Sequence, residues 1–314
     1  MNVLVTSISK KIPMLKSIKI ALNKFEPTGR LFGGDIDQQV VGKYFVDEFW
    51  EMPQLPNLRI DDLLHYCKTN NIGAIIPTRD GELEYFSKNK GDLKKNGISV
   101  MVSDLDAILT TLDKLTFYKS GSLIGFPVIE TALSVNDLDA YSIVIKERFG
   151  AGARNILLNK TREVAKLEAK QLNDPIFQPF IEGKEYSVDL YISKQSKVIG
   201  SIVRRRQVVQ HGESQVTFTV PNNALEKMCS NFVTDLGLFG HIVLQVIIDH
   251  QNQFNIVECN CRFGGASTLS LSAGMDSFYW FLLEASGKEL SEITFTPNKE
   301  GMKLIRYPED LLII

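Results

Sequence analysis

Three polar residues at alternate positions, Glu258, Asn260 and Arg262, are the first candidates for chemistry in this sequence. They follow an apolar run and precede a pair of glycines. Because alternate residues of a β-strand share one face, a strand here would gather a carboxylate, an amide and a guanidinium on one side and place Val257 and Cys259 on the other. A solvated strand face is the simple alternative. The residue types favour a site for a metal ion and phosphate, because carboxylate and amide oxygens suit Mg²⁺.

Gln245 is the second signal, because it interrupts an otherwise apolar run where a polar side chain needs a reason. The link HQNQ predicts the loop of a hairpin in which Asp249 faces Phe254 and Gln245 lies opposite Glu258. Gln245, Glu258 and Asn260 would then offer oxygen ligands to Mg²⁺, which typically binds one or two carboxylates together with substrate phosphates. The alternative is the polar outer face of a half-exposed hairpin, which the apolar neighbours of Gln245 disfavour.

A further set of residues is suited to binding phosphate. Lys146 ends a β-branched apolar run, where a buried ammonium is costly unless it is paired. Gly150 and Gly152 follow, and glycines let a loop bring backbone N–H groups close to an anion. Arg262 would reach the outer phosphate and stabilise charge during its transfer. An edge-strand lysine beside an ordinary hairpin turn explains Lys146 equally well, and the sequence contains no Walker A loop.

The segment FQPFIEGKEYSV passes from one predicted strand to the next and is suited to a nucleotide base. The backbone of Phe180 and Ile181 would offer N–H and C=O groups to an adenine edge beside apolar side chains. Gln178 or Glu185 would reach the ribose hydroxyls. Taken alone, the segment is better interpreted as an ordinary crossing between two domains.

A basic run at 204–206 is the last candidate for the site. Arg204 and Arg206 share one strand face and would bind a substrate carboxylate or the transferred phosphoryl oxygens. A solvated run of charge is the commoner meaning of such a cluster. His211, beside a glycine turn, would contact phosphate, although a lone histidine is usually structural.

The composition is that of an ordinary soluble globular protein. The chain has 314 residues, a length that suits about two domains, and 44% of its residues are hydrophobic. Its formal net charge of −2 gives no sign of binding to nucleic acid or to a membrane surface. The apolar runs are too short to cross a bilayer and no export signal is visible, so we expect a cytoplasmic protein. The four cysteines are too few for a disulfide framework, and they lack the paired Cys-x-x-Cys spacing of zinc sites. We expect them to be small buried apolar residues: Cys67, Cys229, Cys259 and Cys261.

Up to about Leu109, apolar runs that predict strands alternate with helical patterns. Strands are expected at 2–8, 29–37 and 98–104, and a further strand at the start of 72–83, a segment that continues as a loop. Helices are expected at 13–25 and 60–71. This alternation predicts βαβ units and a mostly parallel sheet, whose ligands lie beyond the carboxyl ends of the strands. The absence of Gly-x-Gly-x-x-Gly argues against NAD or FAD. Thr78, Asp80 and Glu82 follow one strand and either contact a substrate or cap the next helix, and the cap is favoured.

After about Thr110 the pattern changes to α+β with mostly antiparallel strands. Strands are expected within 141–159, 175–193, 197–209 and 216–220 and in the hairpin 241–261, with a short strand after Pro127. Helices are expected near the start of 112–131 and at 161–172, 221–240 and 277–287.

Taken together, these stretches resemble the ATP-grasp superfamily, in its branch similar to the large subunit of carbamoyl-phosphate synthetase. The matching segments span nearly the whole chain in the expected order: TNNIGAIIPTRDGEL, DK at Asp113, VIKERFGAGARNI, QPFIEGKEYSVD, HGES, LQVIID and IVECNCRFGGASTL. The resemblance implies a Rossmann-like pre-ATP-grasp α/β domain at 1–109, followed by an α+β ATP-grasp fold. That fold would comprise a lid subdomain with a linker helix at 110–180 and a C-terminal subdomain with the metal site at 181–314.

The resemblance also implies a role for individual residues. Lys114 and Lys146 would bind the nucleotide phosphates, and Lys146 and Arg262 would act in catalysis. The lid loop would be residues 150–153, with Gly150, Gly152 and Ala153 at the nucleotide. The remaining nucleotide contacts would be Gln178, Phe180, Ile181, Glu185 and His211. The ligands of Mg²⁺ or Mn²⁺ would be Gln245, Glu258 and Asn260.

By this resemblance, the chain is an ADP-forming ligase that activates a small carboxylate as an acyl phosphate for attack by an amine. The alternatives are phosphorylation of carbamate or a related acid without an amine, as in one half of a carbamoyl-phosphate synthetase, or an ATP-binding module without catalysis. The chain has Asn-Cys-Arg at 260–262 where Asn-Pro-Arg is common, and its loop SISKK lacks the glycines usual there. No motif identifies the acid or the amine, and the apolar run FYWFLL is either core or a homodimer face.

Overall fold

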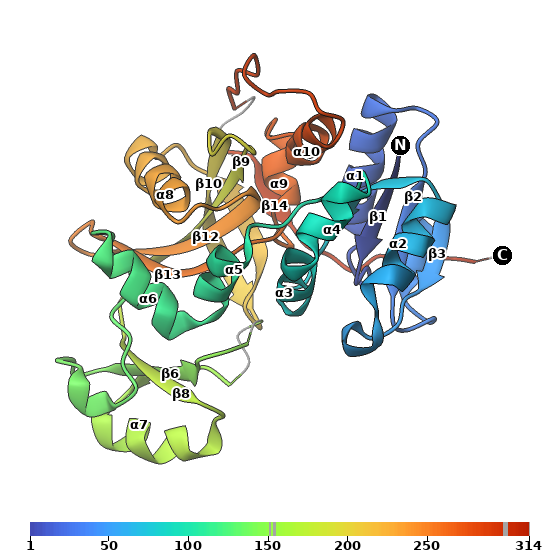
Figure 1. Ribbon diagram of the computed structural model, residues 1–314. Coiled ribbons are helices and arrows are strands. Elements are labelled where there is room, and N and C mark those ends of the chain that lie inside the picture. The colour runs from blue at the N-terminus through green and yellow to red at the C-terminus, as the bar shows by residue number, and fades with distance from the viewer. Residues whose placement is uncertain (151, 153–154, 298–300, 314) are drawn as a thin grey trace.

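The computed structural model describes residues 1–150, 152, 155–297 and 301–313 of the chain. Three β-sheets organise it (Figure 1). Short 3₁₀ turns connect several of their strands and helices: η1 (Val41–Phe45), η2 (Leu55–Asn57), η3 (Val135–Asp137) and η4 (Ala169–Gln171).

The first sheet is parallel and five-stranded, in the order β3-β2-β1-β4-β5. Its strands are β1 (Asn2–Thr6), β2 (Leu31–Asp35), β3 (Glu48–Glu51), β4 (Ile72–Ile76) and β5 (Ser99–Val100). Its helices are α1 (Ile12–Phe25), α2 (Ile60–Thr69), α3 (Asp80–Lys88) and α4 (Lys90–Lys95). The predicted α/β domain is therefore confirmed. The strand order reverses between β1 and β4, so the loops after these two strands face one crevice, where open parallel sheets bind ligands.

Three elements of this domain differ from the sequence prediction. The edge strand β3 was not predicted, because its terminal residues Glu48 and Glu51 are exposed and only two residues between them carry an apolar signal. The strand predicted at 98–104 pairs only over β5. Helix α3 already begins at Asp80, inside the stretch that was expected to continue as a loop. The favoured capping role is confirmed for Glu82, which accepts hydrogen bonds from the backbone N–H groups before the helix.

The second sheet is small and antiparallel, in the order β7-β6-β8. Its strands are β6 (Ile143–Glu147), β7 (Leu157–Lys160) and β8 (Pro175–Pro179), and its helix is α7 (Arg162–Glu168). Helices α5 (Leu105–Leu112) and α6 (Lys114–Leu123) lead into it from the first domain. In Figure 1 this sheet and α7 project away from the rest of the molecule, below α6. Its own small core includes Val135, Ile143, Ile145 and Phe177.

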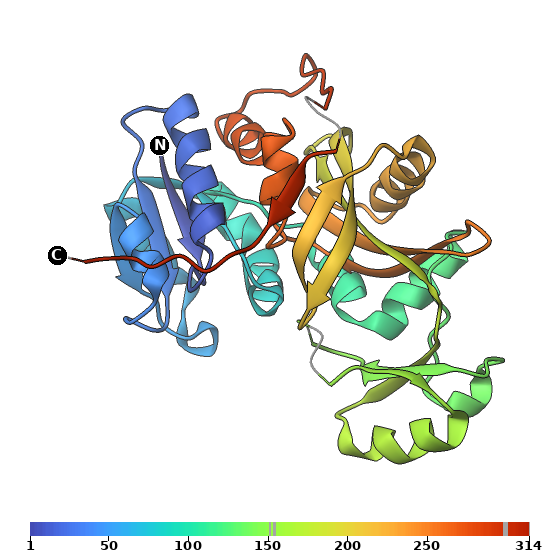
Figure 2. The same cartoon turned by 180° about the vertical axis from the view of Figure 1, so that it is seen from behind.

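The third sheet has six strands in the order β13-β12-β9-β10-β11-β14. Its strands are β9 (Gly183–Ile192), β10 (Val198–Gln210), β11 (Glu213–Thr219), β12 (Gly240–Asp249), β13 (Phe254–Asn260) and β14 (Lys303–Ile305). Helices α8 (Asn223–Asp235), α9 (Thr268–Ser272) and α10 (Ser277–Ala285) accompany it. The predicted α+β second half is confirmed, although β14 and α9 were not foreseen. Beyond β14 the chain runs toward the N-terminal domain (Figure 2).

The hairpin of β12 and β13 contains a β-bulge that the sequence prediction missed. Gln245 does lie opposite Glu258, but Val246 pairs with Ile256 and Ile248, not Asp249, faces Phe254. The ladder shifts by one residue between these pairs, which leaves Val257 without a partner. The predicted pairing beside the loop was therefore wrong by one residue. The bulge compensates for this shift, so the predicted pairing of Gln245 with Glu258 is confirmed. Val257 is also not in the core, whereas Ile256 and Cys259 are buried.

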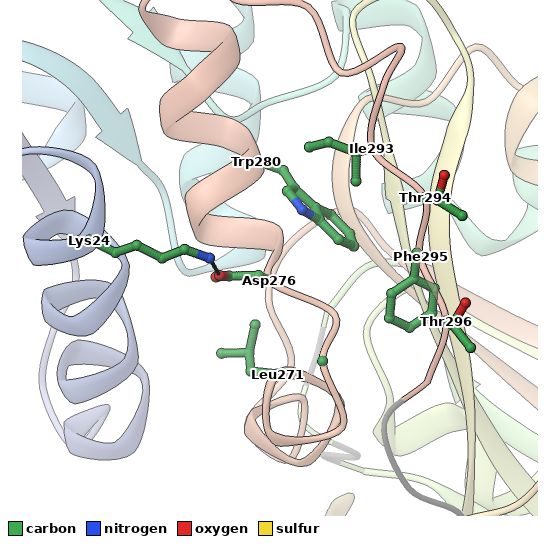
Figure 3. Close-up of a pocket in the computed structure, with 9 residues that line it drawn as sticks. Lys24, Leu271, Asp276, Trp280, Ile293, Thr294, Phe295 and Thr296 are labelled. Atoms are coloured by element: carbon green, nitrogen blue, oxygen red, sulfur yellow. Dashed lines mark hydrogen bonds and ion pairs between the residues drawn. The ribbon is translucent and has the colours of Figure 1, made fainter.

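Helix α10 packs against α1, so the first domain and the third sheet share a hydrophobic core. Phe278, Phe281 and Leu282 are fully buried there, which assigns the apolar run FYWFLL to the core. A hollow of about 370 Å³ lies beside this contact, near the ion pair of Lys24 and Asp276, whose Nζ and Oδ2 atoms are 2.8 Å apart (Figure 3). The hollow shares no residue with the polar hairpin of β12 and β13.

All four cysteines are buried and free, as expected. In the described part of the chain, no three His, Cys, Asp or Glu side chains lie together in a way that could hold a metal ion. Among the helices of the described residues, none is long and apolar enough to cross a membrane.

Gly183 begins β9 where two backbones approach closely, so we predict that Gly183→Ala destabilises the fold. An added Cβ would lie 2.4 Å from the carbonyl oxygen of Ile248, and a backbone atom in a ladder cannot easily move away. We expect the free energy of unfolding to fall by about 1–3 kcal/mol in chemical denaturation. The control is Gly91→Ala in α4, where an added Cβ meets nothing within 4 Å; it should be neutral or stabilise by up to about 1 kcal/mol. Equal stabilities of the two variants would contradict the argument.

Candidate active site

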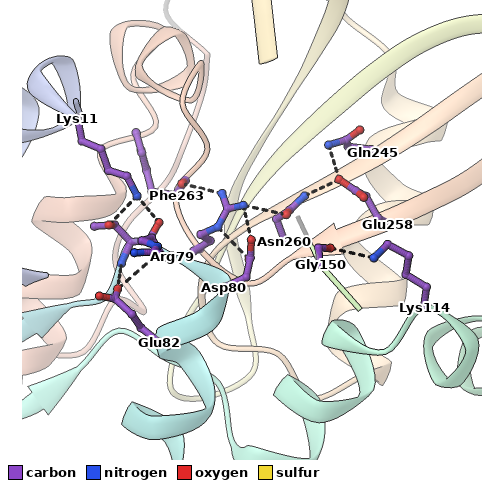
Figure 4. A network of polar contacts seen from close by, with 12 residues as sticks. Lys11, Arg79, Asp80, Glu82, Lys114, Gly150, Gln245, Glu258, Asn260 and Phe263 are labelled. Carbon is purple, nitrogen blue, oxygen red and sulfur yellow. Dashed lines mark hydrogen bonds and ion pairs between the residues drawn. The ribbon is translucent and has the colours of Figure 1, made fainter. Parts of the chain in front are cut away.

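Glu258 is the centre of a polar corner on β12 and β13 (Figure 4). Its Oε1 accepts hydrogen bonds from Gln245 Nε2 at 2.6 Å and from Asn260 Nδ2 at 3.1 Å. The cross-strand pairing of Gln245 with Glu258 and the alternation of Glu258 with Asn260 produce this arrangement. Glu258 Oε2 makes no hydrogen bond to the described residues, so one oxygen of the carboxylate is left for a ligand.

Two arginines bind the outer ends of the two amides. Arg206 Nη1 donates to Gln245 Oε1, and Arg262 Nη2 donates to Asn260 Oδ1 at 3.2 Å. A guanidinium can only donate and an ionised carboxylate can only accept, so the orientation of both amides is determined. The corner is therefore a continuous chain of hydrogen bonds from Arg206 through Glu258 to Arg262. A metal ion bound by the amide oxygens would share them with the arginines or displace these contacts.

The basic run at 204–206 separates into three environments. Arg206 belongs to the site: its guanidinium also donates to the Ser214 hydroxyl at 3.1 Å and to the Gly212 carbonyl at 2.7 Å. Arg205 points to the other face and lies over the Phe218 ring. Arg204 is 2% exposed and pairs with a buried carboxylate, so it is not available to a substrate. The solvated interpretation of the run was therefore wrong for two of the three arginines.

Two lysines approach the polar corner from the small sheet and α6. Lys146 on β6 is 4% exposed, and burial lowers its pKa to about 8, with the nearby Glu258 carboxylate acting in the opposite direction and the nearby Lys114 adding to the decrease. Burial likewise lowers the pKa of Lys114, the first residue of α6. The structure thus brings both predicted phosphate lysines near Glu258, and Lys146 is a buried cation rather than an edge-strand lysine.

Residues at the start of α6 hold Lys114 beside the predicted lid loop. Asp113 caps the helix by accepting from the Leu115 N–H, and it forms a bidentate pair with Arg148, at 2.7 Å and 2.5 Å. Lys114 Nζ donates to the Gly150 carbonyl at 2.9 Å. Gly150 and Gly152 have φ angles of 122° and 77°, in the region that favours glycine. Ala153 lies outside the described residues.

The predicted adenine side is only partly open. Gln178 is buried in β8 and its Nε2 donates to the Thr131 hydroxyl at 2.7 Å. The N–H of Phe180 donates to the carbonyl of Ser142 at 2.8 Å, so it is engaged within the protein. The Phe180 carbonyl and the Ile181 N–H have no hydrogen bond to the described residues and remain for a ligand.

Two further predicted residues lie nearer to solvent. The Glu185 side chain is 50% exposed, and its Oε2 is 3.4 Å from Arg206 Nη1. His211 is exposed at the turn between β10 and β11, with a φ angle of 50°. Its side chain has no hydrogen bond to any described residue, but the carbonyl of the next residue, Gly212, accepts from Arg206 of the polar corner at 2.7 Å.

Several polar residues of the N-terminal domain also face this site and were not assigned to it from the sequence (Figure 4). Lys11, in the loop after β1, donates to the carbonyl and hydroxyl of Thr78 at 2.5 Å and 2.6 Å. Burial and the nearby Arg262 lower the pKa of Lys11 to about 8. Asp80 binds Arg262 directly. The position of Lys11 at a strand end, beside the switch in strand order, is the signal that would have identified it.

A buried carboxylate, Asp189, anchors the loop that follows Arg262. It accepts from Arg204 Nε, from the Ser267 hydroxyl, from the Ser270 hydroxyl at 2.6 Å and from His241 Nε2 at 3.2 Å. Burial would raise its pKa, but Arg204 and these hydrogen bonds hold that pKa well below its usual value. The sequence signal was an acidic residue inside the apolar strand YSVDLYI, the kind of interruption that identified Gln245.

Two family models match the chain. Residues 171–307 match the model described as ATP-grasp in the biosynthetic pathway with Ter operon. Residues 3–101 match the model described as the PylC-like N-terminal domain. No protein in the curated set matches.

Solved structures with the same fold cover nearly the whole chain. The biotin carboxylase domain of Hydrogenobacter thermophilus 2-oxoglutarate carboxylase has a TM-score of 0.73 and 17% identity, over 93% of this chain and 71% of that one. For N5-carboxyaminoimidazole synthetase of Staphylococcus aureus with ADP, the TM-score is 0.73 and the identity 14%, over 95% and 80%. For L-amino acid ligase of Bacillus licheniformis, the values are 0.70 and 14%, over 94% and 77%.

The family matches and the fold agree with the predicted resemblance to the ATP-grasp superfamily, which is confirmed. Residues 171–307 match an ATP-grasp model of the Ter-operon type, residues 3–101 match a PylC-like N-terminal model, and the solved structures share the fold of nearly the whole chain.

Because Lys146 carries a buried charge, we predict that Lys146→Met stabilises the unliganded protein while it removes nucleotide binding. The pKa of Lys146 is about 8 in the folded protein and 10.5 for an ordinary lysine. Between pH 8 and pH 10.5 the unfolded chain therefore binds more protons than the folded protein. The charge therefore costs stability at pH 7, by roughly 1–3 kcal/mol, and this cost disappears as the pH rises from 8 toward 10.5. Scanning calorimetry should show a higher Tm for the variant at pH 7 and a smaller difference at pH 9.5.

The same experiment with MgADP measures binding. Wild-type protein should gain several degrees in Tm, and Lys146→Met should gain little. Lys88→Met, which removes an exposed surface cation, is the matched control and should keep the full gain. A normal nucleotide-induced gain in Lys146→Met would remove Lys146 from the phosphate site.

Proposed function

We propose that this chain is an ADP-forming ligase, which uses ATP to activate a small carboxylate for attack by an amine. One observation carries the proposal: the Glu258 carboxylate, bonded by two amides between two arginines, lies near two partly desolvated lysines on α6 and β6. A triphosphate with its metal ion supplies the charges that such an arrangement is built to receive.

The residues present fit a hard divalent cation. Glu258 offers an open carboxylate oxygen. The amide oxygens of Gln245 and Asn260 accept from Arg206 and Arg262, and the ion would share them with these arginines or displace them. Carboxylate and amide oxygens are the ligand types that Mg²⁺ or Mn²⁺ prefers. These three residues would hold the ion. When bound, it would neutralise charge on the ATP phosphates and orient them.

The remaining site residues would bind ATP. Lys114 and Lys146 would bind its phosphates, beside the loop that begins at Gly150. The free carbonyl of Phe180 and the N–H of Ile181 would bind the adenine edge. Glu185 would accept from the ribose. His211 would contact the nucleotide from the turn between β10 and β11, next to the Gly212 carbonyl that accepts from Arg206.

The reaction would proceed in two displacements. An oxygen of the acid substrate attacks the γ-phosphorus of ATP, the bond to the bridging oxygen breaks, and ADP leaves. The amine then attacks the acyl carbon, the acyl–oxygen bond breaks, inorganic phosphate leaves with the electron pair, and the amine loses a proton. No side-chain nucleophile is required. Arg262 and Lys146 would stabilise the negative charge that moves during the first displacement.

The names of the structural relatives support this reaction class. They include an N5-carboxyaminoimidazole synthetase, an L-amino acid ligase and the biotin carboxylase domain of a carboxylase. The cytoplasmic location stays a prediction. Formation of a homodimer also stays a prediction. The apolar run that suggested it is part of the core, so that run no longer supports a dimer face.

The test is a screen of small acids against amines for ADP release, with Glu258→Gln as the matched variant. Glutamine keeps the shape of the side chain but removes the charge at the metal corner. We expect at least one acid–amine pair to stimulate ADP release, and we expect Glu258→Gln to lower kcat by about 100-fold or more. A cooperative unfolding transition in the absence of nucleotide would show that the variant is folded.

Three outcomes separate the candidate functions. ADP release that requires both acid and amine supports the ligase. ADP release that needs no amine, with the acyl phosphate trapped by hydroxylamine, would replace it by a phosphorylating half reaction. Binding of ATP without turnover across the whole panel would leave an ATP-binding module.

A further inference from the structure

Arg262 forms a bidentate ion pair with Asp80 of the N-terminal domain, a residue that lies 182 positions away in the sequence. Arg262 Nε is 2.9 Å from Asp80 Oδ1, and Arg262 Nη2 is 2.6 Å from Asp80 Oδ2. The two side chains are only 19% and 18% exposed. Two parallel hydrogen bonds fix the plane of a guanidinium as well as its position, which a single contact cannot do.

The same guanidinium reaches the candidate metal corner. Its Nη2 also donates to Asn260 Oδ1, at 3.2 Å. Arg262 therefore bridges two groups that belong to different domains, namely a carboxylate at the end of the parallel sheet and an amide that would bind the metal ion. Its remaining contact with described residues is long, 3.5 Å from Nη1 to the carbonyl of Phe263. Nη1 is thus the part of the fork that is free to meet a phosphoryl oxygen.

Asp80 is itself held by a rigid support. It is the first residue of the nine-residue helix α3, where a carboxylate is favoured by the helix dipole. Two residues on, Glu82 is 2% exposed and accepts from the Thr6 hydroxyl at 3.0 Å and from the N–H groups of Thr78 and Arg79 at 3.1 Å and 3.2 Å. These bonds tie the start of α3 to the ends of β1 and β4. Figure 4 shows Glu82 beside Arg79 and Asp80 at the start of the helix.

We propose that Asp80 is a positioning residue for phosphoryl transfer: it orients the Arg262 guanidinium so that Nη1 faces the transferred group. The proposal rests on the proposed ligase function. It makes the N-terminal domain part of the catalytic machinery, because the arginine that stabilises the moving charge is aligned from there. Misplacement of such a group by about 1 Å is enough to cost on the order of 100-fold in rate.

The experiment compares Asp80→Asn with wild type in steady-state kinetics. Asparagine keeps one acceptor oxygen but loses the charge and the bidentate geometry, so kcat should fall by 10- to 100-fold while the KM for ATP stays within about 2-fold. Asp80→Glu should recover part of kcat. Asp62→Asn, which breaks an exposed bidentate pair with Arg59 elsewhere in the same domain, is the matched control and should behave as wild type.

A double variant tests whether Asp80 acts through Arg262. If it does, adding Asp80→Asn to Arg262→Lys should lower kcat no further than Arg262→Lys alone, because the two changes remove one interaction. Additive losses, or a kcat of Asp80→Asn within 2-fold of wild type, would overturn the proposal and leave the ligase function intact.

Labelling of Arg262 with phenylglyoxal, read by peptide mass spectrometry, tests the ion pair without turnover. Labelling should be several-fold faster in Asp80→Asn than in wild type or Asp62→Asn. An unchanged rate would overturn the proposal, because the pair would then not protect Arg262 in solution. Absence of ADP release from wild type with every acid and amine would instead reject the proposed function, and with it a positioning role in catalysis.

Discussion

The site depends on one carboxylate that is bound on one oxygen and left open on the other. Glu258 accepts two amide N–H groups through Oε1, and the arginines at the far ends of those amides leave neither amide free to turn. Negative charge at this position also offsets the cost of burying Lys146 near it. Lysine, amide and carboxylate are thus stable together only because each compensates the charge or the hydrogen-bonding need of the others.

A second carboxylate, Asp189, which is fully buried, holds the loop beyond Arg262 in place. Asp189 lies on the same sheet, two residues along β9 from Ser187, which pairs with Gln245. It holds Ser267 and Ser270, and through them the glycine-bearing turn, while Arg204 neutralises it. The six-stranded sheet therefore fixes both ends of the segment that carries Arg262, through the partly buried Glu258 before it and the fully buried Asp189, which binds the loop after it.

Much of this arrangement follows from short-range patterns. Alternation in the hairpin identified Glu258 and its neighbours, and an amide inside an apolar run identified Gln245. The bulge at Val257 could not be predicted, because the loop length and the strand spacing each allow a shift of one residue and only packing decides between them. The partnership of Asp80 with Arg262 was equally inaccessible, since it joins two domains and neither residue type indicates its partner. The N–H of Phe180 is engaged by Ser142, just before the neighbouring strand β6, and local composition does not reveal that contact.

The bulge at Val257 also separates the outer turn of the hairpin from the polar corner. Because the ladder slips by one residue at this point, the pairing of Ile248 with Phe254 and the pairing of Gln245 with Glu258 follow different registers. A residue gained or lost near the turn can be absorbed by gaining or losing a bulge, instead of turning Glu258 to the opposite face. Insertions and deletions in the turn can therefore accumulate during evolution while the spacing of the acid, the amide and the guanidinium is inherited unchanged.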